Sequence, residues 1–492
     1  MSSTAYEKIT ARAREIALIE NTANVLQWDQ ETYLPRQAND YRGQQLAYLS
    51  GQSHRLFIAP EVGDWLKEAA DGAPAMGSAE AANIARWQRR YERATCVPVE
   101  FVETLEREKS RGHATWVEAR QKNDFSIFQP SLTRLLDYSR SLAEFWGYNG
   151  EPYDALLETY EPGATTAQLT TLFGELRPSL IALLNERRNQ QRPLQRLDGH
   201  FPAAAQAAFV REVAEAIGYD FGAGRIDVTA HPFCSTSGPR DIRITTRYDE
   251  SDFLSALYSV LHETGHALYE MGLPEDQFGL PSGSASSNGI HESQSRLWEN
   301  HVGRSGTFWK RWTDDALAQF PDLADYSPDE ITAATQSVQP SLIRVEADEM
   351  TYDLHIMLRF TLETALLRGE LEVTGLPTAW NELFQKSLGL RVPDAARGCL
   401  QDIHWSFAGF GYFPTYTLGN LNASQLMATA EKKIPQLDDE LTLGNYDPLL
   451  QWLRENVHRH GQTLHASEIM ERATGETTNP KYHLEYLRAK YL

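Results

Sequence analysis

The sequence has few cysteines and no long apolar run. Its 492 residues include only Cys96, Cys234 and Cys399. Three widely separated cysteines form neither a disulfide framework nor a Cys-x-x-Cys metal site. No stretch approaches the roughly 18 continuous apolar residues of a membrane span, and the charged N-terminal segment "MSSTAYEKITARAREIALIE" lacks the apolar core of a signal peptide. These absences predict a cytoplasmic protein.

Positive charge is also scarce in this chain. It has 46 Lys and Arg against 67 Asp and Glu, for a net charge of −21, and it has no long basic run. A polyanion of this kind repels nucleic acid and acidic membranes, so neither is expected as a partner. The composition is 41% hydrophobic and 10% aromatic, which suffices for a large core.

Most of the chain has the apolar spacing of α-helices. The pattern is clear over residues 5–27, and similar patterns occur around 80–120, 131–146, 166–187, 202–217, 343–368 and 376–390. Short breaks rich in proline and glycine separate them, and no internal repeat, low-complexity block or Pro/Ser linker is present. The sequence therefore predicts a mainly α protein with one domain over residues 1–492.

Residues 225–250 differ, because β-branched residues and turn formers are frequent there. "DIRITTRY", residues 241–248, alternates in the manner of a β-strand, and "VTAHPF", residues 228–233, is its expected partner across the turn "STSGPR", 235–240. This small sheet directly precedes a predicted helix over 252–270. A sheet edge beside that helix would hold an extended peptide by main-chain hydrogen bonds.

The segment "VLHETGHALYE", residues 260–270, carries the strongest chemical signal. His262 and His266 are four residues apart, so they lie on one face of a helix about 6 Å apart along its axis, and both imidazoles can reach one zinc ion. Glu263 lies about 100° further around the helix, where it can approach an attacking water without binding the metal. This is the His-Glu-x-x-His arrangement of zinc peptidases.

The alternative is an ordinary buried helix whose polar residues find hydrogen bonds elsewhere. Apolar neighbours surround the motif, including Val260, Leu261, Ala267 and Leu268. Burying two histidines and a glutamate without partners is costly, and metal coordination removes that cost, so we favour the zinc site. Gly265 lowers helix propensity, but the lack of a side chain allows another group to approach the helix closely.

A zinc site of this type needs a third protein ligand and an open position. Glu270 shares the face of His266, but it lies about 12 Å along the axis from His262, too far for both to bind one ion. The third ligand must therefore come from outside this helix.

After a loop over residues 272–289, the chain resumes a helical pattern in "IHESQSRLWENHVG", residues 290–303. Glu292 is the expected third ligand, and it shares a helix face with Ser295, Arg296 and Glu299. His291 is the alternative, because neighbouring residues point about 100° apart and only one of the two can face the metal. Two imidazoles and one carboxylate are a common hydrolytic zinc set.

At this point the motifs resemble the carboxypeptidase Taq family, the M32 zinc carboxypeptidases. The matching segments are "HPF" 231–233, "DIRIT" 241–245, "HETGH" 262–266, "HESQS" 291–295, "IRVEAD" 343–348, "GCLQDIHW" 398–405 and, near the N-terminus, "VLQWDQETYLP" 25–35. The resemblance spans nearly the whole chain, and the six spaced motifs of residues 231–405 are far more specific than one.

The resemblance implies a large helical single-domain metallopeptidase with a deep active-site groove, usually a homodimer. It implies removal of C-terminal residues from peptides with broad side-chain tolerance. It implies one zinc ion per chain, with cobalt as a substitute, bound by His262, His266 and Glu292, and it implies Glu263 as the general base. The expected partners are peptide substrates with a free C-terminus.

An exopeptidase must recognise a free carboxylate, and the forked donors of a guanidinium suit this task. Arg344 in "IRVEAD" is the leading candidate, and its alternative is an ion pair with Glu346 or Asp348. Arg243 on the predicted strand is the second candidate, with an exposed cross-strand pair as its alternative.

His231 and two tyrosines complete the set of candidate substrate-binding residues. Pro232 holds His231 extended, so that His231 borders the site or remains a loop histidine with one backbone hydrogen bond. Tyr412 and Tyr416 lie in "IHWSFAGFGYFPTYTLGN", residues 403–420. They would donate to the substrate carboxylate or to a developing oxyanion, or else pack in the core.

Two other functions share part of this evidence. A zinc endopeptidase or dipeptidyl-type peptidase would use the same metal chemistry, and a helical binding protein would hold a structural metal. Glu263 discriminates against the binding protein, because a structural site needs no base. The absence of Gly-x-Ser-x-Gly argues against a serine hydrolase.

Overall fold

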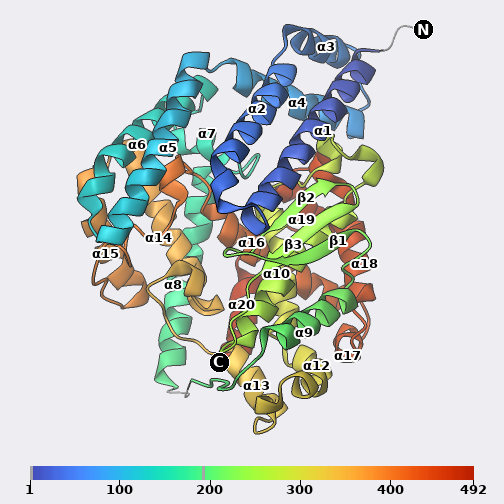
Figure 1. Ribbon diagram of the computed structural model, residues 1–492, viewed down its shortest axis with the longest axis vertical. Helices are drawn as coiled ribbons and strands as arrows, with labels where there is room; N and C mark the ends of the chain where they lie inside the picture. Colours follow the sequence, from blue (N-terminus) through green and yellow to red (C-terminus); the bar gives the residue numbers. More distant parts are fainter. Residues whose placement is uncertain (1–3, 191–193) are drawn as a thin grey trace. The chain divides into compact units, whose positions relative to one another are not determined.

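The computed structural model describes residues 4–190 and 194–492 (Figure 1). Its internal contacts divide the chain into two units, each assembled from three segments. Unit 1 comprises Met1–Glu92, Gln195–Thr335 and Asn422–Thr478, and unit 2 comprises Arg93–Leu194, Gln336–Leu421 and Asn479–Leu492. Each unit has its own buried apolar core.

Unit 1 contains a three-stranded sheet and most of the helices. Its α-helices are α1 (Ala5–Thr32), α2 (Asn39–Phe57), α3 (Pro60–Asp71), α4 (Ala79–Thr95), α9 (Ala203–Ala216), α10 (Phe253–Gly272), α11 (Asn288–Arg296), α12 (Gly306–Gln319), α13 (Pro328–Thr335), α16 (Pro414–Lys433), α17 (Leu437–Thr442), α18 (Asp447–Asn456) and α19 (Ala466–Thr474). The last residues of α4 and the first residues of α16 belong to unit 2. Short 3₁₀ turns are η1 (Arg36–Ala38), η2 (Glu275–Gln277), η3 (Pro281–Gly283), η5 (Pro321–Leu323) and η9 (His458–Thr463), and η4 (Leu297–Gly303) is a π-helix.

The regular elements among the described residues of unit 2 are all helices. Its helices are α5 (Val99–Lys122), α6 (Phe125–Trp146), α7 (Pro152–Leu157), α8 (Thr166–Asn189), α14 (Glu349–Arg368), α15 (Leu376–Leu388) and α20 (Lys481–Tyr491), with the 3₁₀ turns η6 (Arg344–Glu346), η7 (Val373–Gly375) and η8 (His404–Phe407). The long helix α14 lies in the middle of the unit 2 core, where most of its side chains are buried. The mainly α prediction is confirmed.

The sheet has the order β1-β3-β2, with β1 (Gly224–Val228), β2 (Cys234–Gly238) and β3 (Asp241–Thr246). β1 runs parallel to β3, and β2 runs antiparallel to it. The predicted strand at 241–248 is confirmed as β3, but its predicted antiparallel partner, 228–233, is wrong. The partner is β2, which occupies most of the predicted turn 235–240, so that a tighter connection joins the two strands.

Helix α10 lies against this sheet in contact with β2 and β3 (Figure 1). The predicted neighbourhood of sheet and metal helix is therefore confirmed. The Asp252 side chain begins α10 by accepting a hydrogen bond from the backbone N–H of Ser255, at 3.3 Å. This cap satisfies one of the free donors of the first turn.

Two predicted helices are interrupted in the structure. The pattern around 80–120 forms α4 and α5, because Pro98 restricts the residue before it and lacks an N–H. The pattern at 343–368 divides into η6 and α14, and the Asp348 side chain caps the start of α14. No helix in residues 4–190 and 194–492 has the length and apolar character that a membrane crossing needs.

Candidate active site

The site lies in unit 1, where helix α10 packs against α11 at very short range. Gly265 makes this approach possible, because a Cβ atom there would stand 2.5 Å from the carbonyl oxygen of Gln294 and 2.6 Å from Cα of Ser295. Any larger residue would push the helices apart. The close approach that the sequence allowed at Gly265 is thus confirmed, and it brings Glu292 of α11 over the two histidines of α10.

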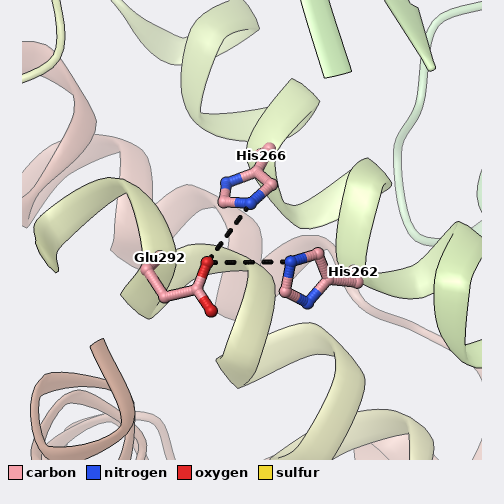
Figure 2. Close-up of side chains that lie close together, drawn as sticks. All are labelled: His262, His266 and Glu292. Atoms are coloured by element: carbon pink, nitrogen blue, oxygen red, sulfur yellow. Dashed lines mark ion pairs between the residues drawn. The ribbon is translucent and has the colours of Figure 1, made fainter. Parts of the chain in front are cut away.

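His262, His266 and Glu292 point toward one another (Figure 2). The distance from Nε2 of His262 to Oε2 of Glu292 is 3.7 Å, and the distance from Nε2 of His266 to the same oxygen is 3.4 Å. One ligand atom from each residue lies within 4.8 Å of the other two. Among the described residues, this is the one group of three or more His, Cys, Asp and Glu side chains with metal-binding spacing.

The other ring nitrogen of each histidine is held by a hydrogen bond. Nδ1 of His262 lies 2.9 Å from Oε2 of Glu299, and Nδ1 of His266 lies 3.1 Å from the backbone carbonyl oxygen of His291. Both partners accept, so each Nδ1 is the donor and each Nε2 keeps its lone pair. This is the outer arrangement that orients imidazoles toward a metal.

The protonation of the two imidazoles follows from their surroundings. Burial, and after it the neighbouring His291, lower the pKa of His266 to about 3. Burial would also lower the pKa of His262, but the charges of Glu292 and the hydrogen bond with Glu299 outweigh it and raise that pKa. In Glu292, burial opposes ionisation, yet Arg296 and His262 hold the pKa well below its usual range.

Glu299 fixes His262 because it is itself fixed by two arginines. Its Oε2 accepts from Arg296 at 3.2 Å, and its Oε1 accepts from Arg304 at 3.1 Å. Burial favours the neutral acid, but Arg296 leads the effects that hold the pKa of Glu299 below its ordinary value. Glu299 lies in the π-helix η4, and π-turns inside helices occur often at functional sites.

Glu263 lies beside the three side chains on α10 and is only 7% exposed. Its pKa is raised to about 7 chiefly by burial, with His262 opposing this shift and Glu292 adding to it. Glu263 accepts no hydrogen bond from any residue that the structure describes. Its oxygens are therefore available to a small molecule that approaches the histidines.

The three side chains fit a divalent metal ion. Two imidazole nitrogens at about 2.05 Å from a tetrahedral ion stand about 3.3 Å apart, close to the 3.4 and 3.7 Å measured between Nε2 and Oε2 here. Each distance exceeds the usual length of a charge-assisted hydrogen bond, about 2.7–2.9 Å. The donor set of two imidazoles and one carboxylate suits zinc.

His291, the alternative third ligand, points away from this group. Its Nε2 lies 2.9 Å from Oε1 of Glu270, and its ring stacks on that of His266 at 4.4 Å between centroids and 24° between planes. The second oxygen of Glu270 accepts from the Thr236 hydroxyl at 3.1 Å. Glu270 is therefore bonded to His291 and Thr236 and not to the two histidines of the motif. This agrees with the prediction that Glu270 lies too far along the helix from His262 to bind the same ion.

A cavity of about 660 Å³ adjoins the site on the side of His291. Its walls come from α1, from the segment that includes β2, and from α10 and α11: Asn24, Gln27, Trp28, Glu31, residues 231–236, Glu270 and His291. His231 is exposed and lines this cavity. The predicted position of His231 at the border of the site agrees with this placement.

Arg243 contacts Asp241 on its own strand and Trp28 on α1. Its Nε donates to Oδ1 of Asp241 at 2.6 Å, and its guanidinium lies 4.3 Å from the centre of the Trp28 ring. The partner is on the same strand, two residues away, so the arginine does form an ion pair, although not the cross-strand pair considered from sequence. These contacts favour a structural role for Arg243.

Arg344 lies in unit 2 and is 6% exposed. Its Nε donates to Oδ1 of Asp402 at 2.9 Å, and its Nη1 donates to the Tyr352 hydroxyl at 2.8 Å. Burial lowers the pKa of this guanidinium, but Tyr352 and Asp402 raise it well above its ordinary value. The ion pair with Glu346 or Asp348 is not formed, because Asp402 provides the carboxylate from a distant part of the chain.

Tyr412 and Tyr416 belong to unit 2, as Arg344 does. The two rings are 5.4 Å apart and nearly perpendicular, and the Arg344 guanidinium lies 4.9 Å from the centre of the Tyr416 ring. The Tyr416 hydroxyl is 3.4 Å from Nε2 of His404. Asp402 does not bond with His404, since it accepts from Arg344 and Arg359.

Sequence reasoning assigned no role to Glu299, Arg304 or the residues of α1 that line the cavity. A signal for Glu299 was present, because it shares a predicted helix face with Glu292. Arg304 is five residues from Glu299 in the chain, whereas Asn24 is 212 residues from Thr236, and no local spacing indicates the second contact.

Two histidines and a carboxylate that face one another, with a glutamate beside them, are the arrangement expected of a metallopeptidase. The sequence matches the family model described as "Carboxypeptidase Taq (M32) metallopeptidase" over residues 8–491. The chain therefore belongs to the M32 carboxypeptidase family. It is an enzyme, a metallocarboxypeptidase that hydrolyses peptide bonds, and its family implies a metal cofactor and peptide substrates.

Individual relatives agree over nearly the full length. Thermostable carboxypeptidase 1 of Thermus thermophilus is 41% identical over 501 residues, covering 99% of this chain and 98% of the relative. Carboxypeptidase 1 of Bacillus subtilis is 36% identical, covering 97% and 96%. The crystal structure of the M32 carboxypeptidase from Deinococcus radiodurans R1 superposes with a TM-score of 0.96 at 39% identity, covering 99% of both chains.

Proposed function

We propose that this metallocarboxypeptidase uses zinc, bound by His262, His266 and Glu292, and that Glu263 is its general base. The observation that supports this assignment is the convergence of two Nε2 atoms on one carboxylate oxygen, at 3.7 and 3.4 Å. One zinc ion per chain matches this donor set, and cobalt accepts the same ligands as a substitute.

The side chains of the site then divide the work of hydrolysis. Zinc supplies a Lewis acid for the scissile carbonyl oxygen and for the attacking water. Glu263, whose oxygens accept no bond from described residues, takes the proton of that water and passes it to the leaving amine. Glu299 and the His291 carbonyl hold the imidazoles in place throughout.

The substrate lies along β2 in this proposal. The sheet order leaves one edge of β2 without a neighbouring strand, and the cavity of about 660 Å³ adjoins residues 231–236. An extended peptide can pair with such an edge through main-chain hydrogen bonds. His231 borders the same cavity and would contact the bound peptide.

The residue that recognises the C-terminal carboxylate stays a prediction from the sequence. We retain Arg344 as the candidate, with Tyr412 and Tyr416 as hydroxyl donors, because a guanidinium that Asp402 and Tyr352 hold rigid is well suited to bind a carboxylate. Arg243 is the weaker candidate, since Asp241 and Trp28 already engage it. Broad side-chain tolerance, the deep groove, the single domain over 1–492, the homodimer and the cytoplasmic location stay predictions.

The test compares two forms of one peptide. The zinc-loaded protein is incubated with a peptide that ends in a free carboxylate and with its C-terminal amide, and products are followed over time by mass spectrometry. We expect stepwise release of single residues from the free acid and at least about tenfold slower cleavage of the amide, the cost of one lost charged hydrogen bond. Equal rates, or internal or dipeptide products, would favour the endopeptidase or dipeptidyl alternative.

A further inference from the structure

Only some main-chain N–H and C=O groups of β2 point to the edge that faces the cavity. Phe233 and Thr245 are hydrogen-bonded across the sheet, because the Thr245 N–H donates to the Phe233 carbonyl at 2.9 Å. Bonded and non-bonded pairs alternate along an antiparallel ladder. Given the register of the two strands, Ser235 also faces β3, whereas the N–H and C=O groups of Cys234 and Thr236 point to the free edge.

The opposite strand confirms this direction. Ile242, which is paired with Thr236, donates its N–H to the Ala223 carbonyl on the β1 side of β3, at 2.9 Å. Ile242 therefore does not bond with Thr236 through that group. Thr236 is free to bond outward, and a peptide that added to β2 would meet Cys234 first and Thr236 two residues further along.

One of these outward groups is already occupied. The side-chain amide of Asn24, on α1, donates from Nδ2 to the Thr236 carbonyl oxygen at 2.9 Å. Asn24 and Thr236 both line the cavity of about 660 Å³. The N–H of an added strand would otherwise donate to this carbonyl oxygen. The Asn24 amide therefore takes the place of a main-chain N–H of the substrate.

The side chains of β2 give the direction of the bound peptide. Burial raises the pKa of the Cys234 thiol most, and the charge of Glu263 raises it more than that of Glu270 does. The Thr236 hydroxyl instead bonds to Glu270, almost two helical turns beyond Glu263. Cys234 is therefore the end nearer the base. A peptide antiparallel to β2 then has its scissile bond toward Cys234 and its N-terminal part toward Thr236, the polarity that a carboxypeptidase needs.

We propose that Asn24 is a specificity-determining residue that ends the strand-like pairing of the substrate at Thr236. The substrate residue opposite Cys234 makes main-chain bonds to β2, and the residue two positions toward its N-terminus loses its donor site to Asn24. The inference rests on the proposed placement of the peptide along β2. It assigns to α1, which contributes no metal ligand, control over how many substrate residues the enzyme binds.

An amide-to-ester scan tests this assignment. N-acetylated peptides of six residues with a free C-terminus are prepared with each non-scissile amide replaced in turn by an ester, which removes one N–H donor without adding bulk. Values of kcat/KM are measured for the zinc-loaded wild type, for Asn24→Ala and for Gln27→Ala. Gln27 is the matched control, because it lines the same cavity from the same helix and has no hydrogen bond to β2 within the described residues.

For the wild type we expect a single sensitive amide among the residues that pair with β2, with a loss of about 2- to 10-fold, the value of one hydrogen bond. In Asn24→Ala a second sensitive amide appears, two residues closer to the N-terminus. The all-amide peptide then gains about 2- to 10-fold over wild type, while a peptide too short to reach Thr236 does not. Gln27→Ala keeps the wild-type pattern.

Two sensitive amides two residues apart in the wild type would overturn the proposal, as would an unchanged pattern in Asn24→Ala. The wild-type scan decides the matter even when the variant folds poorly, which its melting temperature reveals. Failure of the wild type to release C-terminal residues from the parent peptide would instead overturn the proposed function. The two failures are therefore distinguishable.

Discussion

Two buried glutamates, one in each unit, have the same pKa but opposite surroundings. Burial raises the pKa of both Glu263 and Glu363 to about 7. Glu363 accepts hydrogen bonds from Trp405 at 2.7 Å, from Tyr153 at 2.8 Å and from the backbone N–H of Gly411 at 3.1 Å. Glu263 accepts none from the residues that the structure describes.

This difference shows that a shifted pKa alone does not identify a catalytic group. Glu363 is a structural acceptor, because both of its oxygens are bonded by donors in the core of unit 2. Glu263 is buried without a hydrogen bond from the described residues, beside two imidazoles whose Nε2 atoms are also unused as donors. Uncompensated burial persists in native proteins mainly at functional sites.

The charged clusters of the two units show the same contrast. In unit 2, Asp402 accepts hydrogen bonds directly from Arg344 and Arg359, with donor distances of 2.9 and 2.7 Å. In unit 1, His262 and His266 face Glu292 at 3.7 and 3.4 Å. The first cluster is held by direct hydrogen bonds between opposite charges, and the second has the spacing of ligands around a cation.

The largest effect is expected at Glu263, whose replacement sharpens the contrast between the two glutamates. Glu263→Gln keeps the size of the side chain but removes the base, so turnover should fall by about 10²- to 10⁴-fold. Metal content should stay at one ion per chain, because Glu263 is not a ligand. Peptide hydrolysis and elemental analysis of the same sample provide the test, and undiminished hydrolysis would refute the role of Glu263.

Glu363 should instead affect stability and its dependence on pH. Its pKa in the folded protein, about 7, exceeds the ordinary value of 4.5, so the folded state keeps a proton that the unfolded chain loses between these values. Its contribution is complete below pH 4.5 and is lost as the pH rises through 7. The shift of about 2.5 units corresponds to about 3 kcal/mol of unfolding free energy at most.

Melting temperatures between pH 4.5 and 8 measure this contribution. Glu363→Gln cannot ionise, so its melting temperature should fall less steeply with rising pH than that of the wild type. Glu103→Gln, which changes an exposed carboxylate of α5, should keep the wild-type slope. If the slope of Glu363→Gln equals that of the wild type, Glu363 does not titrate in this range.

A smaller effect is expected at Glu299, which tests the contrast between the charged clusters. Glu299→Gln loses the carboxylate that orients His262, and zinc affinity should fall by about 10- to 100-fold. Asp402→Asn is the matched control, because it also removes a buried carboxylate that two arginines bind. It should reduce stability and leave zinc affinity unchanged, as measured by competition with a chelator.

If both variants lose zinc equally, general destabilisation explains the loss and Glu299 has no special relation to His262. If neither loses zinc, the orientation of His262 does not depend on Glu299. If Glu299 orients His262, zinc affinity must fall in Glu299→Gln and stay unchanged in Asp402→Asn.

Local patterns in the sequence predicted much of this fold. The helical spacing and the uninterrupted segment 252–270 gave α10 to within two residues, and alternation identified β3. The partner of β3 was wrong, because "STSG" has the small polar residues of a turn, yet it pairs as β2 once the core supports it. The prediction of a continuous helical pattern around 80–120 overlooked Pro98, a helix-breaking signal that is visible in the sequence.

In the site, spacing was informative wherever residues share one helix. The positions of His262, Glu263 and His266 followed from helical geometry, and the preference for Glu292 over His291 agrees with the directions of their side chains. The partners of Arg344 and Thr236 were not predictable. Asp402 and Asn24 are 58 and 212 residues away in the chain, and only the packed structure brings such residues together.

The central claim is that one cation binds between α10 and α11. A crystal of the protein equilibrated with zinc, measured above and below the zinc absorption edge, tests it most directly. The account predicts one anomalous peak per chain at about 2.0–2.2 Å from Nε2 of His262, Nε2 of His266 and an oxygen of Glu292. Imidazoles that point apart with no density between them, or a zinc ion held by His291 in place of Glu292, would contradict it.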